Sequence, residues 1–259
     1  MSTTGKALDL LRHFTFDRPE IGLSDLCRLA GRDKATTFRH LAALESSGLL
    51  EQVAGSRRYR IGALPLRLAA LRERSVPRRA AVRPVLAHLA AATGETAHVA
   101  ILQGGELMSL AQHESPVHAN RVVVHEMSLP LHATASGNAV LAYADAALRA
   151  EARANLRRFT EHTLASEAAF DRVIADARRI GFGVSEEGFE LGVIGIAAPL
   201  FDDSGSAVGS VAVASVASRM TTDLSLQIRD ELRAAARSIS ASWGGMIPAE
   251  LEAAWETTD

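Results

Sequence analysis

Helical periodicity dominates the first fifty residues of the chain. Apolar residues recur every three or four positions in residues 5–14, 24–31 and 34–48, which predicts three short helices. Ser24 and Asp33 stand where N-capping side chains are expected, and glycines close the second and third segments. The short link between these two segments is typical of a helix-turn-helix.

A β-hairpin is expected directly after the third helix. Residues 49–62 contain two strand-like runs around a glycine, and Arg57, Arg58 and Arg60 lie on or beside the second run. The order of helix, helix, short turn, helix and hairpin predicts a winged helix-turn-helix domain over residues 1–62.

The rest of the chain combines helices with strands. Residues 63–78 are expected to form a linker helix that ends near residue 74, and residues 79–259 a second domain. Its expected strands cover residues 98–102, 106–113, 121–124, 181–185, 192–201 and 206–216, and its expected helices cover residues 79–92, 136–155, 167–180 and 222–242. The predicted fold class is α+β, in which the second domain is a mixed α/β unit of the sensor type.

The composition excludes several classes of protein. The apolar runs are far shorter than the roughly 20 residues that span a bilayer, and the amphipathic N-terminal segment does not resemble a secretory signal. The single cysteine, Cys27, excludes an internal disulfide and a cysteine-based zinc site. We therefore expect a cytoplasmic protein with no membrane contact and no cofactor.

Charge is distributed unevenly along the chain. The net charge is −2, yet residues 1–75 hold 13 Lys or Arg against 8 Asp or Glu, whereas the remainder holds 15 against 22. A basic segment on an acidic body indicates that the first domain binds a polyanion. The alternative is a chance fluctuation of surface charge.

The third helix has two different faces. Helical spacing places Thr37, Leu41 and Leu44 on one face, with His40 beside them, and this face is expected to pack on the core. Arg39 lies opposite among alanines, and such a face can lie close in a major groove, where arginine pairs with guanine. The alternative is an ordinary surface helix rich in alanine.

Other side chains of this domain could hold the DNA backbone. Lys34 and Thr36 stand at the start of the third helix, where phosphates are favoured by the free backbone N–H groups. The arginines of the hairpin could contact the backbone or the minor groove.

The chain resembles the IclR family of bacterial transcription regulators. DKATTFRHLAALESSGLLEQ is similar to the family's recognition helix and wing entry, and YRIGALPLRLA to its wing exit and linker helix. LPLHATASGNAVLA and GFGVSEEGFELGVIGIAAPLFDDSGSAVGSVAVAS resemble the two signature stretches of its effector-binding domain. The resemblance covers about residues 5–245.

The resemblance implies a GAF-like effector-binding second domain, a homodimer or dimer of dimers, and no catalysis. It implies a ligand-responsive regulator of double-stranded operator DNA that senses a small organic molecule, such as a carboxylate or an aromatic catabolite. The residues expected to contact DNA are Lys34, Ala35, Thr36, Phe38, Arg39, Arg57 and Arg58. The effector pocket carried over by position comprises Leu129, Ala135, Ser136, Ser185, Val193, Gly195, Ala212 and Ala214.

Several positions depart from the family pattern. Asn138 stands where the family often has lysine, and Ser185 and Gly195 stand where it can carry an acidic side chain and a cysteine. Ala212 and Ala214 occupy positions that can carry serine. Because this floor is smaller and less polar, we expect a bulkier, partly apolar ligand, such as an aromatic compound.

Two other functions stay open at this point. Ser136 follows His132 by four residues, which suggests a nucleophile and its base, yet no orienting group or oxyanion hole is evident. An enzyme with a DNA-binding appendage would use residues 129–138 and 185–195 as its active site. A constitutive DNA-binding protein whose second domain only oligomerises is the other alternative.

A metal site is not expected. The histidines that invite the hypothesis are spread over predicted strands and loops, without the local spacing of metal ligands. They are His98, His113, His118, His125 and His132, to which Glu186, Glu187 and Glu190 could add oxygens.

Overall fold

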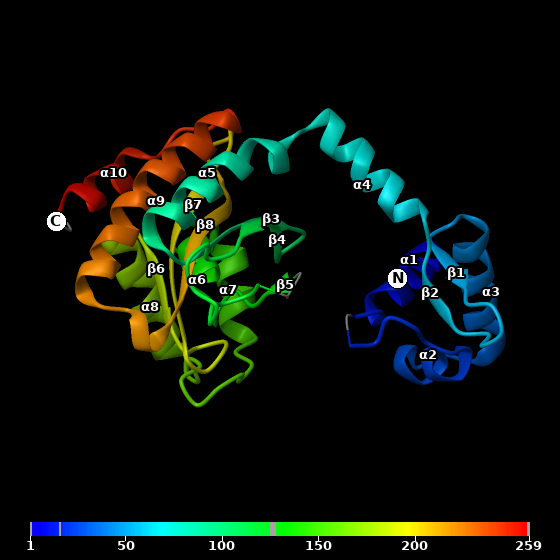
Figure 1. Cartoon of the computed structure of the whole chain (residues 1–259). Helices are drawn as coiled ribbons and strands as arrows, with labels where there is room; N and C mark the ends of the chain where they lie inside the picture. The colour runs from blue at the N-terminus through cyan, green and yellow to red at the C-terminus, as the bar shows by residue number, and fades with distance from the viewer. Residues whose placement is uncertain (1, 16, 125–127, 258–259) are drawn as a thin grey trace. The chain divides into compact units, whose positions relative to one another are not determined.

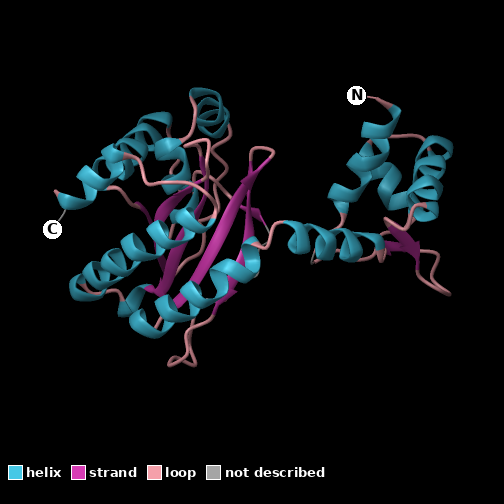
Figure 2. Ribbon diagram, turned by 90° about the horizontal axis from the view of Figure 1, so that it is seen from above, coloured by secondary structure: helices cyan, strands magenta, loops and turns pink. Residues whose placement is uncertain are grey.

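A computed structural model describes residues 2–15, 17–124 and 128–257 of the chain. The chain divides into two compact units, residues 1–77 and 78–259, and each unit has a hydrophobic core of its own. Figure 1 labels the elements of both units, and Figure 2 distinguishes their helices from their strands.

The first unit is a helical domain with a small antiparallel sheet. Its elements are α1 (Thr3–Asp9), η1 (Leu10–His13), α2 (Leu23–Ala30), α3 (Lys34–Ser46), β1 (Leu50–Gln52), β2 (Tyr59–Ile61) and α4 (Leu64–Ser75). Leu50 of β1 pairs with Ile61 of β2 to form the wing. The predicted winged helix-turn-helix is therefore confirmed.

Of the two N-caps predicted in the first unit, one is confirmed and the other is wrong. The Asp33 side chain accepts the backbone N–H of Thr36 at 2.8 Å, so the predicted cap of α3 is confirmed. Ser24 is not the cap of α2, which follows Gly22 and begins at Leu23. Because Leu23 packs against the core of the unit, the first turn includes it and Ser24 faces solvent.

The second unit is built on a six-stranded antiparallel sheet with the strand order β5-β4-β3-β8-β7-β6. Its strands are β3 (Thr96–Gln103), β4 (Glu106–His113), β5 (Ser128–Leu129), β6 (Gly183–Glu186), β7 (Val193–Phe201) and β8 (Ala207–Val216). Its helices are α5 (Arg78–Thr93), α6 (Ala135–Tyr143), α7 (Ala146–Ala154), α8 (Glu167–Ile180), η2 (Ala217–Arg219), α9 (Thr222–Ser242) and α10 (Ala249–Glu256).

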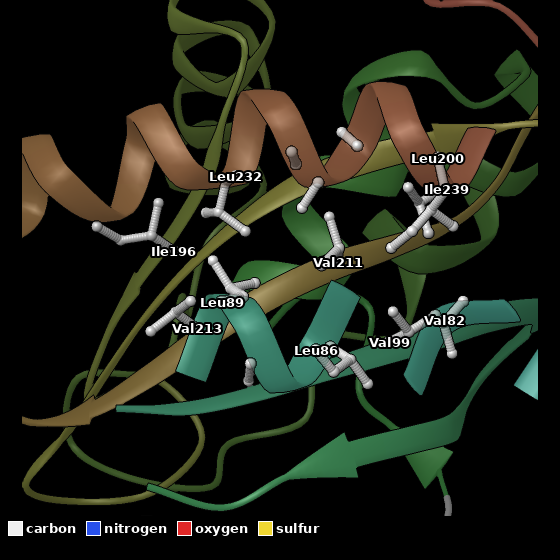
Figure 3. Packing of buried hydrophobic residues seen from close by; sticks show 14 of the residues in the cluster. Val82, Leu86, Leu89, Val99, Ile196, Leu200, Val211, Val213, Leu232 and Ile239 are labelled. Carbon is white, nitrogen blue, oxygen red and sulfur yellow. The ribbon is translucent and has the colours of Figure 1, made fainter. Parts of the chain in front are cut away.

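The two faces of this sheet carry side chains of different size. Along β8, Val211 and Val213 point to one face and Ala212 and Ala214 to the other, as the two-residue period of a strand requires. The valine face packs against α5 and α9, and the branched side chains interdigitate there (Figure 3). The alanine face is covered by α6.

Close packing brings α6 onto the alanine face. A Cβ atom on Gly183 of β6 would lie 2.2 Å from the Ala135 carbonyl oxygen, and one on Gly137 would lie 2.0 Å from the Leu131 carbonyl oxygen. Neither position can hold a larger residue unless the backbone moves. Gly183 therefore allows the N-terminal turn of α6 to pack against the sheet, and Gly137 allows the same turn to pack against the loop before the helix.

The structure corrects two predictions in the second unit and adds one helix. Residues 121–124 form no strand, and the Val122 carbonyl oxygen accepts the Thr96 hydroxyl at 2.6 Å instead of a ladder hydrogen bond. The helix predicted over residues 136–155 is two helices, because Ala144 is extended and Asp145 caps α7. The sequence pattern also missed α10, which buries Trp255.

The linker helix and the long terminal helix agree with their predictions, since α4 and α9 lie where helical periodicity placed them. None of the helices in the described ranges is both long enough and apolar enough to cross a membrane.

Leu232→Ala should lower the free energy of unfolding of the second unit by about 2–5 kcal/mol, because Leu232 is fully buried between α9 and the sheet. Urea denaturation followed by circular dichroism measures this loss. Leu226→Ala on the same helix is the control, since Leu226 is 48% exposed, and it should change stability little. Equal losses in both variants would contradict the packing described here.

Candidate functional site

Five of the seven residues that were predicted to contact DNA lie on α3. Lys34, Ala35, Phe38 and Arg39 are exposed and Thr36 is half-buried. The opposite face is buried against the core through Thr37, His40, Leu41 and Leu44. Within the described part of the chain, the side chains of Lys34 and Arg39 have no hydrogen-bond or ion-pair partner and are free to reach a ligand.

The arginines of the wing have different partners. The Arg58 guanidinium donates to the Glu20 carbonyl oxygen, and Arg60 forms an ion pair with Glu51 at 2.6 Å. Arg57 is exposed at the tip with a φ of 54°, and its side chain meets no partner among the residues described. Arg57 is thus the wing cation that is most available to a phosphate, whereas Arg58 ties the wing to the segment before α2.

A cavity of about 360 Å³ lies between α6 and the sheet of the second unit. All eight residues predicted for the effector pocket line it. Sequence reasoning missed the other lining residues, which are His98, Val122, Val123, Val124, Thr134, Phe189 and Glu190. His98 reaches the cavity through the register of β3, and the other six lie in loops or at the cap of α6, where no local sequence pattern indicates a shared cavity.

Cross-strand pairs form the floor of the cavity. Ser185 of β6 pairs with Gly195 of β7, which pairs in turn with Ala214 of β8. Ala212 of β8 lies opposite His98 of β3. Since paired residues share a face, a row of small side chains and one histidine lies under α6. The small side chains leave room for a ligand.

The N-terminal turn of α6 contributes free hydrogen-bond donors. The Thr134 hydroxyl accepts the Gly137 N–H at 3.0 Å and donates to the Pro130 carbonyl oxygen, so it caps the helix. The N–H groups of Ala135 and Ser136 meet no acceptor in the described structure. Two donors at the positive end of a helix suit an anionic group.

Ser136 is paired with a different histidine from the one that the sequence suggested. His132 Nε2 lies 2.7 Å from the Arg157 carbonyl oxygen, whereas His98 Nε2 lies 3.2 Å from Ser136 Oγ. Burial lowers the pKa of His98 from 6.5 to about 4, so the ring is neutral near pH 7. Its Nδ1 has no partner in the described part of the chain, and thus no described acid orients the ring as in a hydrolase.

One side of the cavity is apolar, and the described lining contains one carboxylate and no cation. Three consecutive valines, Val122 to Val124, line one side. Phe189 lines the cavity too and packs edge-to-face on Phe159, with ring centroids 5.1 Å apart. Glu190 is exposed, and no Lys or Arg occurs among the described lining residues.

Asn138, which departs from the family's frequent lysine, is buried and does not line this cavity. Its Nδ2 donates to the Val184 carbonyl oxygen at 2.8 Å, which ties α6 to β6. Among the described residues, no group of three or more His, Cys, Asp or Glu lies together as metal ligands would, and His125 lies outside the described residues.

Two family models match the chain, one in each of its two compact units for most of the matched length. The IclR helix-turn-helix domain matches residues 3–54, and the C-terminal domain of the bacterial transcriptional regulator IclR matches residues 70–241. The chain belongs to the IclR family. It is a DNA-binding transcriptional regulator with a GAF-like effector-binding domain, and the proteins of this family are not enzymes.

Curated relatives span nearly the whole of this IclR-family chain. The HTH-type transcriptional regulator XynR of Escherichia coli is 27% identical, covering 92% of this chain and 96% of its own. The glycerol operon regulatory protein of Streptomyces coelicolor is 28% identical, with 91% and 95% covered. The probable transcriptional regulator SauR of Cupriavidus necator is 30% identical, with 78% and 81% covered.

Solved structures show the same architecture. An IclR transcriptional regulator from a Silicibacter species is 44% identical with a TM-score of 0.92, covering 96% of this chain and 99% of its own. An IclR homologue from Microbacterium hydrocarbonoxydans, solved with 4-hydroxybenzoate, is 23% identical with a TM-score of 0.76, and 93% and 99% of the two chains are covered.

Stability should fall as the pH drops from 6.5 to 4, and His98 should account for part of the loss. The pKa of His98 in the folded protein, about 4, is below the ordinary 6.5, so the unfolded chain binds the proton first. The contribution is present in full above pH 6.5 and is lost as the pH falls to 4, by up to roughly 3 kcal/mol.

Urea midpoints at several pH values measure this loss in the wild type and in His98→Gln. The variant should show a shallower decline, because all carboxylates titrate equally in both proteins. Parallel declines would show that His98 is not held neutral by burial.

Proposed function

We propose that the protein binds a palindromic operator as a homodimer or dimer of dimers and that a small, partly apolar organic acid controls this binding. The observation that carries the proposal is the cavity under α6, where all eight predicted effector residues meet beside free backbone donors. The other unit of the same chain presents an exposed arginine, Arg39, on α3.

The exposed face of α3 supports direct reading of bases. Ala35, Ala42 and Ala43 are exposed on that face and allow the helix to approach base edges, while Arg39 is long enough to pair with guanine O6 and N7. Lys34 and Arg57 supply phosphate contacts, which position the domain without reading sequence.

The surface of α4 supports self-association. Leu66, Leu68 and Leu71 are 76%, 49% and 53% exposed, and no described residue of α4 is buried. An exposed run of leucines is unfavourable in water, and a second copy of the chain would cover it. Two copies place two recognition helices on two half-sites, which is the geometry of a palindrome.

The cavity supports an acid with an apolar body. Its carboxylate would accept hydrogen bonds from the N–H groups of Ala135 and Ser136. Its apolar body would contact Phe189 and the three valines at 122–124. A volume of about 360 Å³ exceeds what a two- or three-carbon acid fills. The homologue solved with 4-hydroxybenzoate supports an aromatic ligand.

Regulation requires that the ligand bind two arrangements of the protein with different affinity, since equal affinity shifts no equilibrium.

The first test is fluorescence anisotropy of the full-length protein on DNA from its own upstream region, against a scrambled duplex at two salt concentrations. Preference for the native duplex at physiological salt supports a sequence-specific regulator. Equal binding that salt abolishes on both duplexes would overturn the proposal.

Arg39→Ala should reduce the preference for the native over the scrambled duplex by about ten-fold or more, because one bidentate arginine–guanine pair discriminates at about that level. Arg57→Ala is the matched control on the wing, and it should weaken binding to both duplexes alike and lower the salt dependence. Anisotropy titrations measure both ratios. An unchanged preference in Arg39→Ala would show that this side chain does not read a base.

Ser136→Ala should weaken the response of the protein–DNA complex to an effector several-fold, because it removes a hydroxyl from the cavity and leaves His98 without its partner. The variant should stay folded with a lower unfolding temperature, because a buried His98 nitrogen loses its partner, and its binding to DNA without effector should stay close to the wild type. A response equal to that of the wild type would show that Ser136 does not contact the ligand.

A further inference from the structure

Phe38 is a large apolar residue on the solvent-facing side of α3. It is 53% exposed, although the other large apolar residues of the helix, Leu41 and Leu44, are buried. The hydrophobic core of the first unit forms without it. A single exposed apolar side chain is common on protein surfaces, so its neighbours on the helix decide what it can do.

Helical spacing aligns Phe38 with two exposed alanines. Ala35 precedes it by three residues and Ala42 follows it by four, so the three side chains form an apolar row opposite the buried face. Arg39 is also exposed and lies beside this row. Over residues 35–43, the face opposite the core therefore carries one hydrogen-bonding side chain and a row of groups that form no hydrogen bonds.

The major groove of DNA offers one apolar group to such a row. Its base edges present hydrogen-bond donors and acceptors, and the C5-methyl group of thymine is the group that differs from them. Contact of a phenyl ring with a polar base edge or a phosphate displaces water without replacing its hydrogen bonds, which is unfavourable. The ring of Phe38 therefore favours thymine at the base pair that it meets.

Phe38 and Arg39 reach the same part of the groove. Successive residues of a helix are separated by about 1.5 Å along its axis, whereas base pairs are stacked about 3.4 Å apart. Two adjacent side chains on one exposed face thus meet the same base pair or neighbouring ones. The thymine contacted by Phe38 is expected beside the guanine that is proposed for Arg39.

We propose that Phe38 is a specificity-determining residue, which contacts the methyl group of a thymine in the major groove of each operator half-site. The proposal rests on the proposed function, in which α3 of each protomer binds half of a palindrome. Uracil lacks this methyl group but keeps every base-pairing atom of thymine. DNA in which uracil replaces thymine should therefore lose the contact with Phe38 and keep those of Arg39 and Lys34.

Uracil-substituted DNA tests the proposal on the full-length protein. The upstream region is amplified with dUTP in place of dTTP, and both forms are compared by fluorescence anisotropy. A scrambled duplex made in both forms shows what the substitution does without sequence recognition. The wild type should bind the native duplex about ten-fold more weakly when it contains uracil, because one buried methyl group favours binding about four-fold and a dimer contacts two.

Three variants separate the phenyl ring from other causes. Phe38→Ala should bind the two forms of the native duplex almost equally, and Phe38→Leu, which keeps an apolar side chain, should keep part of the difference. Leu8→Ala removes an apolar side chain of similar exposure from α1 and should keep the wild-type ratio. Phe38→Ala should fold, because the side chain is exposed and alanine favours a helix.

The outcomes also distinguish the proposal from the function on which it rests. Equal affinity of the wild type for both forms of the native duplex would overturn the thymine contact and leave sequence-specific binding in place. An equal loss in the wild type and in Phe38→Ala would show that another residue meets the methyl group. Lack of preference for the native over the scrambled duplex, when both contain thymine, would overturn the proposed function itself.

Discussion

The close approach of α6 to the sheet is the constraint on which the site depends. A nine-residue helix can present its first N–H groups to a ligand only if its end is fixed, and Gly137 and Gly183 allow backbone contacts that no side chain would permit. The Thr134 cap satisfies one donor and leaves two others free. The cavity is therefore the space that remains where a small-residue floor meets a tightly held helix end.

The other face of the same sheet carries large side chains and forms the core of the unit. Val211 and Val213 alternate with Ala212 and Ala214 along one strand, so large side chains fill the core against α5 and α9 while small ones leave a cavity on the other face. Because the period of a strand is two, a register slip of one residue would fill the cavity and open the core. The core packing thus fixes the register that also creates the site.

Sequence analysis succeeded where the signal was local. The Asp33 cap, the glycine end of α8 and the helix α9 each follow from neighbouring residues, and the predicted helices match. The eight residues predicted for the effector pocket came from a family resemblance, and strand register brings six of them to one cavity beside Ala135 and Ser136 of α6. His98 was considered only as a metal ligand, because nothing within its own strand indicates that Ser136, 38 residues away, is its partner.

Tertiary contacts explain the remaining misses. Residues 121–124 have the composition of a strand, but they form no ladder hydrogen bonds. The Thr96 hydroxyl donates to the Val122 carbonyl oxygen instead. Nearby, Glu95 is 1% exposed and accepts hydrogen bonds from Nε and Nη2 of Arg219, at 2.6 and 2.7 Å, while Nη1 of Arg219 donates to the Asn120 carbonyl oxygen. A buried ion pair adds little net stability, but it defines a geometry. The ion pair thus holds Asn120, two residues before the three valines begin, and lies outside the cavity lining, which has one described carboxylate, Glu190, and otherwise neutral side chains.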